Sequence, residues 1–174
     1  MFDAKYVMER IRPIPDYPKK GILFRDITPL LKDPMAFSMC VDELGERLKG
    51  KDIDYIAGIE ARGFIIGPPL AYNMGKGFIP IRKKGRLPGA TISKEYEKEY
   101  GKDAIEMQKD ALEEGSSVVI IDDLLAIGDT ARAAAGLVKE LGASVSAIAF
   151  IIELSELGGR ERLGGYDIVS LVKY

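Results

Sequence analysis

Short apolar runs alternate along the chain with longer segments in which apolar residues recur at helical spacing. The runs are rich in β-branched residues and are bounded by Gly, Pro or charged residues, which is typical of strands. The predicted strands are residues 55–59, 78–82, 118–121, 145–154 and 166–172. Strands that alternate with helices indicate an α/β fold with a mainly parallel, twisted sheet flanked by helices on both faces.

Four segments between these runs are predicted to be helices. Asp3 is placed to cap a short helix that ends near Arg10, and Asp33 followed by Pro34 is a typical helix start. The predicted helices are residues 4–10, 34–48, 63–74 and 130–142. The proline-rich residues 13–18 are expected to form a connector.

Residues 83–103 are polar, rich in glycine and charge, and lack the period of a core element. Loops of this length are uncommon unless they are functional or disordered. The segment is therefore predicted to be a flexible lid, and a surface loop without function is the alternative. Thr91, Ile92 and Tyr96 are compatible with a short hairpin inside it.

Composition places the chain among ordinary globular proteins, because 47% of its 174 residues are hydrophobic and 30% are charged. One domain, residues 1–174, is the natural count for this length. The net charge of −2 argues against a nucleic-acid or membrane partner, and no apolar run approaches the ~20 residues of a membrane span. No signal peptide is visible, and the single Cys40, expected in the core, favours a reducing, cytoplasmic location.

The chain contains no histidine and only one cysteine. Ser-His-Asp and Cys-His catalysis are therefore excluded, as are histidine-based metal sites and structural zinc sites. Acid–base chemistry must fall to carboxylates, Lys, Tyr or the substrate. A divalent ion, if one is used, is expected to be Mg²⁺, held mainly by substrate phosphates and water rather than directly by the protein.

Residues 118–131, with the sequence VVIIDDLLAIGDTA, carry the most specific chemical signal. A buried strand ends in Asp122 and Asp123, and a glycine-containing turn then leads into a helix. Open α/β sheets bind ligands at the carboxyl ends of their strands, and free N–H groups at a helix start suit a phosphate. Two carboxylates can accept hydrogen bonds from two ribose hydroxyls. The motif is neither a Walker A loop nor a GxGxxG fingerprint.

This motif resembles the phosphoribosyl-pyrophosphate (PRPP) site of type I phosphoribosyltransferases. The resemblance implies that Asp122 and Asp123 bind the ribose 2′- and 3′-hydroxyls. It also implies that the following loop binds the 5′-phosphate through Ala126, Ile127, Gly128, Asp129 and Thr130.

The loop departs from the family pattern, T-G-x-T, at two positions. Ile127 replaces a hydroxyl that normally bonds the phosphate, and such a bond to a charged group is typically worth about 1.5–3 kcal/mol. Asp129 brings a carboxylate near a phosphate dianion, unless it points outward and caps the helix. We therefore expect PRPP to bind more weakly than is usual in the family.

Two further segments carry positive charge where a strand ends. Residues 57–67 contain Arg62 at a helix start, and residues 82–86 read RKKGR. Arg side chains and free N–H groups form anion sites. By resemblance, Ala61 and Arg62 bind the pyrophosphate next to a cis peptide bond between them, and Arg82, Lys83 and Arg86 contribute. The alternatives are an Arg62–Glu60 surface pair and a solvated charge run.

Residues 21–31, GILFRDITPLL, narrow the resemblance to the adenine phosphoribosyltransferase family. The family carries this segment in an N-terminal hood, here residues 1–32. By resemblance, Phe24 stacks on adenine, Leu23 and Arg25 offer backbone groups to its edge, and Leu124 covers the opposite face. A core role for Phe24 is the alternative.

The same family has a flexible catalytic loop, here residues 83–107, and Glu99-Tyr100-Gly101 matches its motif. By resemblance, Glu99 handles the purine proton and Tyr100 helps to close the loop.

Taken together, the motifs predict transfer of the phosphoribosyl group from PRPP to adenine with Mg²⁺, which gives AMP and pyrophosphate in purine salvage. The family also implies a homodimer. Two alternatives stay open. One is a phosphoribosyltransferase for a 6-oxopurine, which Leu124 and Leu125 disfavour because they offer no hydrogen-bond donor. The other is a PRPP-binding regulator with reduced activity, which the altered Ile127 and Asp129 favour.

Overall fold

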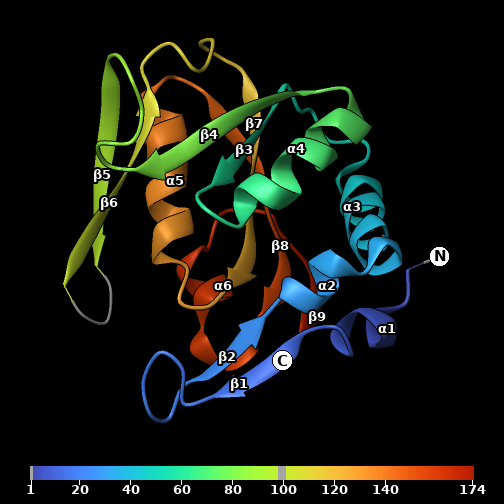
Figure 1. Ribbon diagram of the computed structural model, residues 1–174. Helices are drawn as coiled ribbons and strands as arrows, with labels where there is room; N and C mark the ends of the chain where they lie inside the picture. Colours follow the sequence, from blue (N-terminus) through green and yellow to red (C-terminus); the bar gives the residue numbers. More distant parts are fainter. Residues whose placement is uncertain (1, 98–100) are drawn as a thin grey trace.

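The computed structural model describes residues 2–97 and 101–174. Seven strands form one sheet in the order β5-β6-β4-β3-β7-β8-β9 (Figure 1). The five strands from β4 to β9 in this order are parallel, whereas β6 is antiparallel to both of its neighbours. The strands are β3 (Tyr55–Ile59), β4 (Gly77–Lys83), β5 (Thr91–Glu97), β6 (Lys102–Gln108), β7 (Ser117–Leu125), β8 (Ser144–Glu153) and β9 (Ile168–Lys173). The predicted α/β fold with a mainly parallel sheet is confirmed.

Helices cover both faces of this sheet. The long ones are α3 (Pro34–Leu48), α4 (Gly63–Met74) and α5 (Asp129–Glu140), and a 3₁₀ turn η1 (Ser155–Leu157) precedes the short α6 (Gly159–Arg162). Asp33 caps α3 by accepting from the N–H groups of Met35 and Ala36, as its sequence predicted. In the described part of the chain, no helix is long and apolar enough to cross a membrane.

The segment predicted as the hood, residues 1–32, contains α1 (Ala4–Met8), β1 (Arg12–Pro15), β2 (Leu23–Asp26) and α2 (Thr28–Lys32). Asp3 caps α1 through the N–H of Tyr6. The connector expected at residues 13–18 is wrong in part, because β1 pairs antiparallel with β2 as a separate two-stranded sheet. Proline is compatible with a strand that has no second partner, since its missing N–H interrupts no central ladder.

The segment predicted as a lid is largely an antiparallel hairpin of β5 and β6, visible at the left of Figure 1. Ile105 and Met107 of β6 are buried against the face of the sheet that α5 covers. Their polar neighbours hid this alternation in the sequence. The short hairpin that the sequence allowed within this segment is therefore present, and it is longer than expected. Glu99 and Tyr100 lie outside the described residues.

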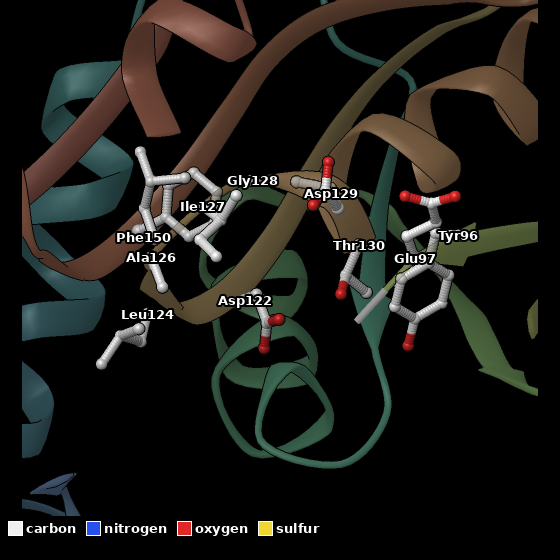
Figure 2. A pocket seen from close by; sticks show the side chains of 12 residues that line it. Tyr96, Glu97, Asp122, Leu124, Ala126, Ile127, Gly128, Asp129, Thr130 and Phe150 are labelled. Carbon is white, nitrogen blue, oxygen red and sulfur yellow. The ribbon is translucent and has the colours of Figure 1, made fainter. Parts of the chain in front are cut away.

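The β7 strand and the loop that follows it lead directly into α5 (Figure 2). Since β7 lies between β3 and β8 in the sheet, its carboxyl end is flanked by the ends of two parallel neighbours. The ends of parallel strands meet at one edge of a sheet, and this edge carries the loops described below.

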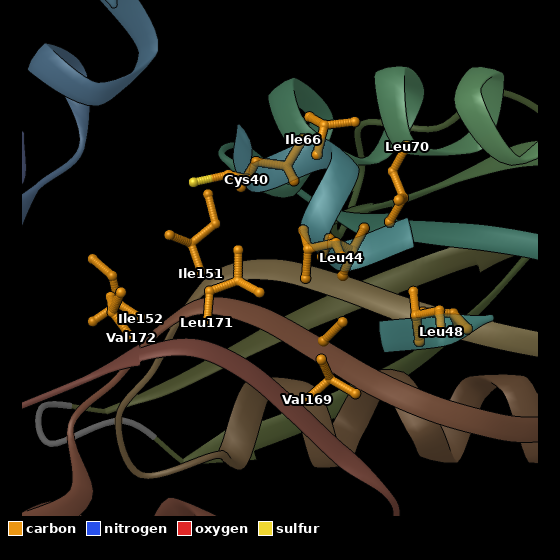
Figure 3. Close-up of a cluster of buried hydrophobic side chains, with 14 of the residues drawn as sticks. Cys40, Leu44, Leu48, Ile66, Leu70, Ile151, Ile152, Val169, Leu171 and Val172 are labelled. Carbon is orange, nitrogen blue, oxygen red and sulfur yellow. The ribbon is translucent and has the colours of Figure 1, made fainter. Parts of the chain in front are cut away.

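Successive residues of each central strand point to opposite faces, so the core divides into two clusters. Val119 and Ile121 of β7 pack with α3, α4 and the hood, whereas Val118 and Ile120 pack with α5. Figure 3 shows the first cluster, in which fully buried Cys40 lies among aliphatic side chains. The predicted core position of Cys40 is confirmed, and burial raises the pKa of its thiol to about 12.

Candidate active site

A cavity of about 380 Å³ opens at the carboxyl end of β7. Figure 2 shows that its wall combines the predicted PRPP residues with side chains from β5 and β8. The lining residues are Tyr96, Glu97, Asp122, Leu124, Leu125, Ala126, Ile127, Gly128, Asp129, Thr130, Ala131 and Phe150. All five residues of the predicted 5′-phosphate loop therefore line one cavity together with Asp122.

The loop is shaped by Gly128, which has a φ of +92° and directly precedes α5. A side chain at this φ is disfavoured, so glycine suits the turn. The first N–H groups of α5 have no carbonyl acceptor within the helix, and no side chain caps them. These donors at the cavity wall, with the Thr130 hydroxyl, form a typical anion site.

Asp129 does not cap α5, contrary to the expectation from sequence, because Gly128 occupies the N-cap position. The Asp129 carboxylate lies 3.1 Å from a guanidinium nitrogen of Arg132 and 3.6 Å from one of Arg162. In Figure 2 the Asp129 side chain extends to one side of the loop, and those of Thr130 and Asp122 extend to the other. Two arginines thus offset its charge beside the anion site.

The two adjacent acids have different surroundings, because neighbouring residues on a strand point to opposite faces. Asp122 lines the cavity, and its Oδ1 accepts a hydrogen bond of 2.9 Å from the Asp123 N–H. Asp123 is 2% exposed and accepts a hydrogen bond from Nε of Arg62. Burial and the negative charge of Asp123 raise the pKa of Asp122 well above its usual range. The cavity wall therefore includes the first acid but not the second.

Glu60, the first residue after β3, lies between the arginines of the RKKGR segment. It accepts hydrogen bonds from the side chains of Arg82 and Arg86 and from the Lys83 N–H. Burial opposes its ionisation, but these donors outweigh burial and hold the pKa of Glu60 at about 2. The alternative pair of Arg62 with Glu60 is wrong, because Arg62 turns to Asp123 instead.

Glu60 was missed by sequence reasoning, although a signal was present in the predicted strands. Parallel pairing of β3 with β4 aligns Ile59 with Ile81, which brings the next residue of each strand together. The cis peptide bond lies between Glu60 and Ala61, one residue before the predicted position between Ala61 and Arg62.

Three of the predicted base-binding residues, Leu23, Phe24 and Arg25, lie on β2, whereas Leu124 lies on β7 and lines the cavity. The Phe24 ring is 5.8 Å from the Arg62 guanidinium carbon and meets the Tyr17 ring edge-on at 5.2 Å. Phe24 is partly exposed and belongs to neither core cluster, which disfavours the alternative of a core anchor. The Arg25 guanidinium stacks 3.8 Å above the Tyr174 ring. Phe24 thus contacts the loop after β3 that is predicted to bind pyrophosphate.

The cavity also contains three side chains from outside residues 118–131 that sequence reasoning did not select, namely Tyr96, Glu97 and Phe150. Tyr96 and Glu97 end β5, and the length of the hairpin was the only signal for their position. Phe150 is buried in the middle of β8, so its sequence context was that of an ordinary core residue.

Comparison with known proteins places these features in one family. A model of the phosphoribosyl transferase domain matches residues 32–169. The adenine phosphoribosyltransferase of Thermoanaerobacter sp. (strain X514) is 56% identical over 94% of this chain and 95% of its own length. That of Caldanaerobacter subterraneus subsp. tengcongensis is 54% identical over 97% of both chains.

Solved structures extend the similarity to the fold. The crystal structure of adenine phosphoribosyltransferase from Thermoanaerobacter pseudethanolicus matches with a TM-score of 0.97 and 53% identity, over 99% of this chain and 100% of that one. The enzyme from Saccharomyces cerevisiae, solved with adenine and an imino-altritol bisphosphate, matches with a TM-score of 0.92 and 41% identity, over 97% and 98% of the two chains.

Proposed function

The chain belongs to the adenine phosphoribosyltransferase family of type I phosphoribosyltransferases, and we propose that it uses the cavity after β7 to transfer the 5-phosphoribosyl group of PRPP to adenine, giving AMP and pyrophosphate in purine salvage. The proposal rests on one observation. The loop from Ala126 to Thr130, at the start of α5, lines the same cavity as the Asp122 carboxylate. Phosphate and ribose need these two kinds of partner side by side.

Asp122 binds a ribose hydroxyl and favours the positive charge that develops on the ribose as pyrophosphate leaves. Its raised pKa reflects a site that disfavours an isolated negative charge, and a cationic ribose relieves this cost. Asp123 has two possible roles. It binds the second ribose hydroxyl after its ion pair with Arg62 rearranges, or it keeps that ion pair and so orients the Arg62 side chain. The backbone N–H groups of the loop and Thr130 hold the 5′-phosphate.

The pyrophosphate is bound by the loop at Ala61 and Arg62 and by the segment of Arg82, Lys83 and Arg86. The exposed Lys83 and Arg86 and the half-exposed Arg62 offer positive charge at the same sheet edge as the cavity. Positive groups fixed before the reaction stabilise the leaving charge without reorganisation.

Mg²⁺ is expected to enter with PRPP. Within the described residues, no group of three acidic side chains lies close enough to form a metal cage. We expect the ion to be held mainly by PRPP oxygens and water, which is the common mode for Mg²⁺ at substrate phosphates. When bound, the ion neutralises charge on the leaving pyrophosphate.

Adenine lies between Phe24 and Leu124, with its edge on the β2 backbone. Among the described residues β2 pairs with β1 alone, so carbonyls on its other edge are not used by the ladder. Such carbonyls suit the adenine amino group, which is a donor. A 6-oxopurine would instead require a donor, which Leu124 lacks.

Glu99 accepts or donates the purine proton, and Tyr100 closes the β5–β6 hairpin over the substrates. Support comes from the family resemblance and from the neighbouring Tyr96 and Glu97, which line the cavity. Carboxylates serve as general bases in many enzymes, and this chain has no histidine for the task.

A homodimer and a cytoplasmic location complete the proposal. Ile65 and Tyr72 lie seven residues apart on α4, hence on one helix face, and are 43% and 90% exposed. Large exposed apolar side chains on one face suit a subunit interface. Sedimentation analysis is expected to give twice the chain mass.

One assay tests the activity. The protein is incubated with PRPP, Mg²⁺ and one of adenine, hypoxanthine, guanine or xanthine, and nucleotides are separated by chromatography. We expect AMP from adenine and no nucleotide from the 6-oxopurines. Binding of PRPP without any nucleotide would support the regulator instead, and a 6-oxopurine nucleotide without AMP would overturn the assignment to adenine.

A further inference from the structure

Glu60 is a carboxylate enclosed by cations at the edge of the sheet where the pyrophosphate is proposed to bind. Its side chain is 8% exposed. Oε2 accepts from Nε of Arg82 at 3.2 Å and from the Lys83 N–H at 3.1 Å. Oε1 accepts from Arg82 at 3.3 Å and from a terminal nitrogen of Arg86. Both carboxylate oxygens are therefore engaged by donors of one segment.

Arg82 and Arg86 differ in how their guanidinium nitrogens bond to protein acceptors and in how exposed their side chains are. Arg82 uses Nε and one terminal nitrogen on Glu60, and its other terminal nitrogen donates to the Arg86 carbonyl at 3.0 Å. Its side chain is 34% exposed, against 53% for Arg86. Arg82 thus acts on the segment itself, whereas Arg86 keeps more of its surface toward solvent and ligands.

A second buried glutamate fixes the backbone of the same segment. Glu106, on β6, is 3% exposed and accepts from the N–H groups of Arg86 at 2.9 Å and Leu87 at 2.8 Å. Glu106 thus fixes the backbone at Arg86, and Glu60 fixes the Arg86 guanidinium. Burying a charged carboxylate is costly. Two buried carboxylates that bond to one short segment therefore indicate that the geometry of this segment is important.

We propose that Glu60 is a positioning residue, which acts through Arg86 to set the guanidinium for the pyrophosphate of PRPP. The inference rests on the proposed function. An oriented guanidinium loses less side-chain entropy when it binds an anion, so preorganisation raises affinity. The opposite possibility is that Glu60 competes with the pyrophosphate for Arg86. The two possibilities predict opposite changes when the charge of Glu60 is removed.

Glu60→Gln keeps the shape and removes the charge. We expect kcat/KM for PRPP to fall about tenfold, with the KM for adenine unchanged, because Arg86 is proposed to bind the pyrophosphate group both before and during its departure. In calorimetry with inorganic pyrophosphate at fixed Mg²⁺, its Kd is expected to rise by a similar factor. Glu60→Asp, which restores the charge, should recover part of the affinity. Glu43→Gln, which removes an ion pair with Arg47 on α3, is the matched control with unchanged kinetics.

A double-mutant cycle separates positioning from a general loss of structure. If Glu60 acts through Arg86, Glu60→Gln should have no further effect on pyrophosphate binding in an Arg86→Gln background. Additive losses, or unchanged or tighter pyrophosphate binding by Glu60→Gln, would overturn the proposal. If Glu60→Gln does not fold, Glu60→Asp takes its place in the cycle. Failure of the wild-type protein to form AMP counts against the proposed function alone, because the pyrophosphate titration needs no turnover.

Discussion

Arg62 and Asp123 form an ion pair that joins the loop after β3 to the end of β7, across 61 residues of sequence. The partners are unequal, since Asp123 is 2% exposed and the Arg62 side chain is 47% exposed. Burial opposes the charge of Arg62, but Asp123 outweighs it and raises the pKa of the guanidinium. The predicted pyrophosphate and ribose sites are therefore connected before any ligand binds.

This asymmetry predicts unequal costs when each partner is removed. Arg62→Ala leaves a buried carboxylate without its cation, and we expect the free energy of unfolding to fall by about 1–3 kcal/mol. Asp123→Asn leaves only a half-exposed cation, which water can solvate, so its loss should be smaller. Urea unfolding at pH 7 measures both. An equal or larger loss in Asp123→Asn would show that burial of Asp123 does not set the cost.

Asp122→Asn is expected to stabilise the fold and impair the enzyme. The pKa of Asp122 is raised in the folded state, so its ionisation favours the unfolded state as pH rises above the unfolded value near 4. Asn removes this penalty, and the variant should unfold at a higher urea concentration at pH 7. The gain should vanish at low pH, where the acid is protonated in both states.

The same substitution removes the carboxylate that we propose as a partner of the ribose. We expect kcat/KM for PRPP to fall roughly tenfold to a hundredfold, since a hydrogen bond to a charged group is worth about 1.5–3 kcal/mol. A variant that is less stable at pH 7, or one with full activity, would contradict the role given to Asp122.

The sequence predicted the parallel strands and the strand–turn–helix unit of residues 118–131 because both depend on local patterns. The apolar run between Asp54 and Glu60 sets the boundaries of β3, and the strand–acid–glycine order of residues 118–131 is contiguous. Glu60 could not be recognised as a partner of Arg86 from its own surroundings, because the contact depends on the β3–β4 pairing and on a side chain 26 residues away.

The hood and the hairpin were harder to predict for related reasons. Pro13 and Pro15 favour a connector in the sequence, yet an isolated two-stranded ribbon tolerates them. Glu97 and Phe150 reach the cavity only through tertiary packing, because one ends a mostly polar strand and the other lies in an apolar run. Local chemistry therefore predicted the anion sites, and strand pairing determined which residues surround the predicted sites.

Ile127→Thr tests the altered phosphate loop. Ile127 lines the cavity, and a hydroxyl at this position can donate to the 5′-phosphate. We expect the KM for PRPP to fall about tenfold, in line with one added hydrogen bond to a charged group. Ile127→Val is the matched control, because valine has the shape of threonine without the hydroxyl. An unchanged KM for PRPP in Ile127→Thr, or an equal fall in both variants, would mean that a hydroxyl at residue 127 does not strengthen PRPP binding.

Gly159→Ala tests the packing behind the same loop. A Cβ on Gly159 would press on the Ala126 carbonyl and lie 2.9 Å from Leu125 Cδ1, so the loop must shift. We expect a higher KM for PRPP and a loss of stability of about 1–3 kcal/mol, as for an overpacked core. Gly45→Ala, in α3, is the control, because its nearest neighbour is 3.9 Å away. That variant should keep the KM and gain about 0.5–1 kcal/mol from helix propensity.

Glu153 is predicted to make stability depend on pH. It lies at the end of β8 and accepts from Arg160 at 2.9 and 2.6 Å, and Arg160 with Ser170 lowers its pKa to about 2 from an ordinary 4.5. A lowered folded-state pKa gives stability that is present above pH 4.5 and is lost as pH falls toward 2. At pH 7, Glu153→Gln should therefore cost on the order of 2–3 kcal/mol.

Urea unfolding of the wild-type protein and Glu153→Gln at pH 7, 5 and 3 measures this contribution. The difference between them should be nearly the same at pH 7 and 5 and smaller at pH 3, because at pH 3 Glu153 is protonated in the unfolded chain but still ionised in the folded protein, so folding must release that proton. Arg160→Gln should give the same pH dependence, since it removes the cation that lowers the pKa. A difference that stays constant down to pH 3 would mean that Glu153 stabilises β8 by packing and neutral hydrogen bonds, not by its charge.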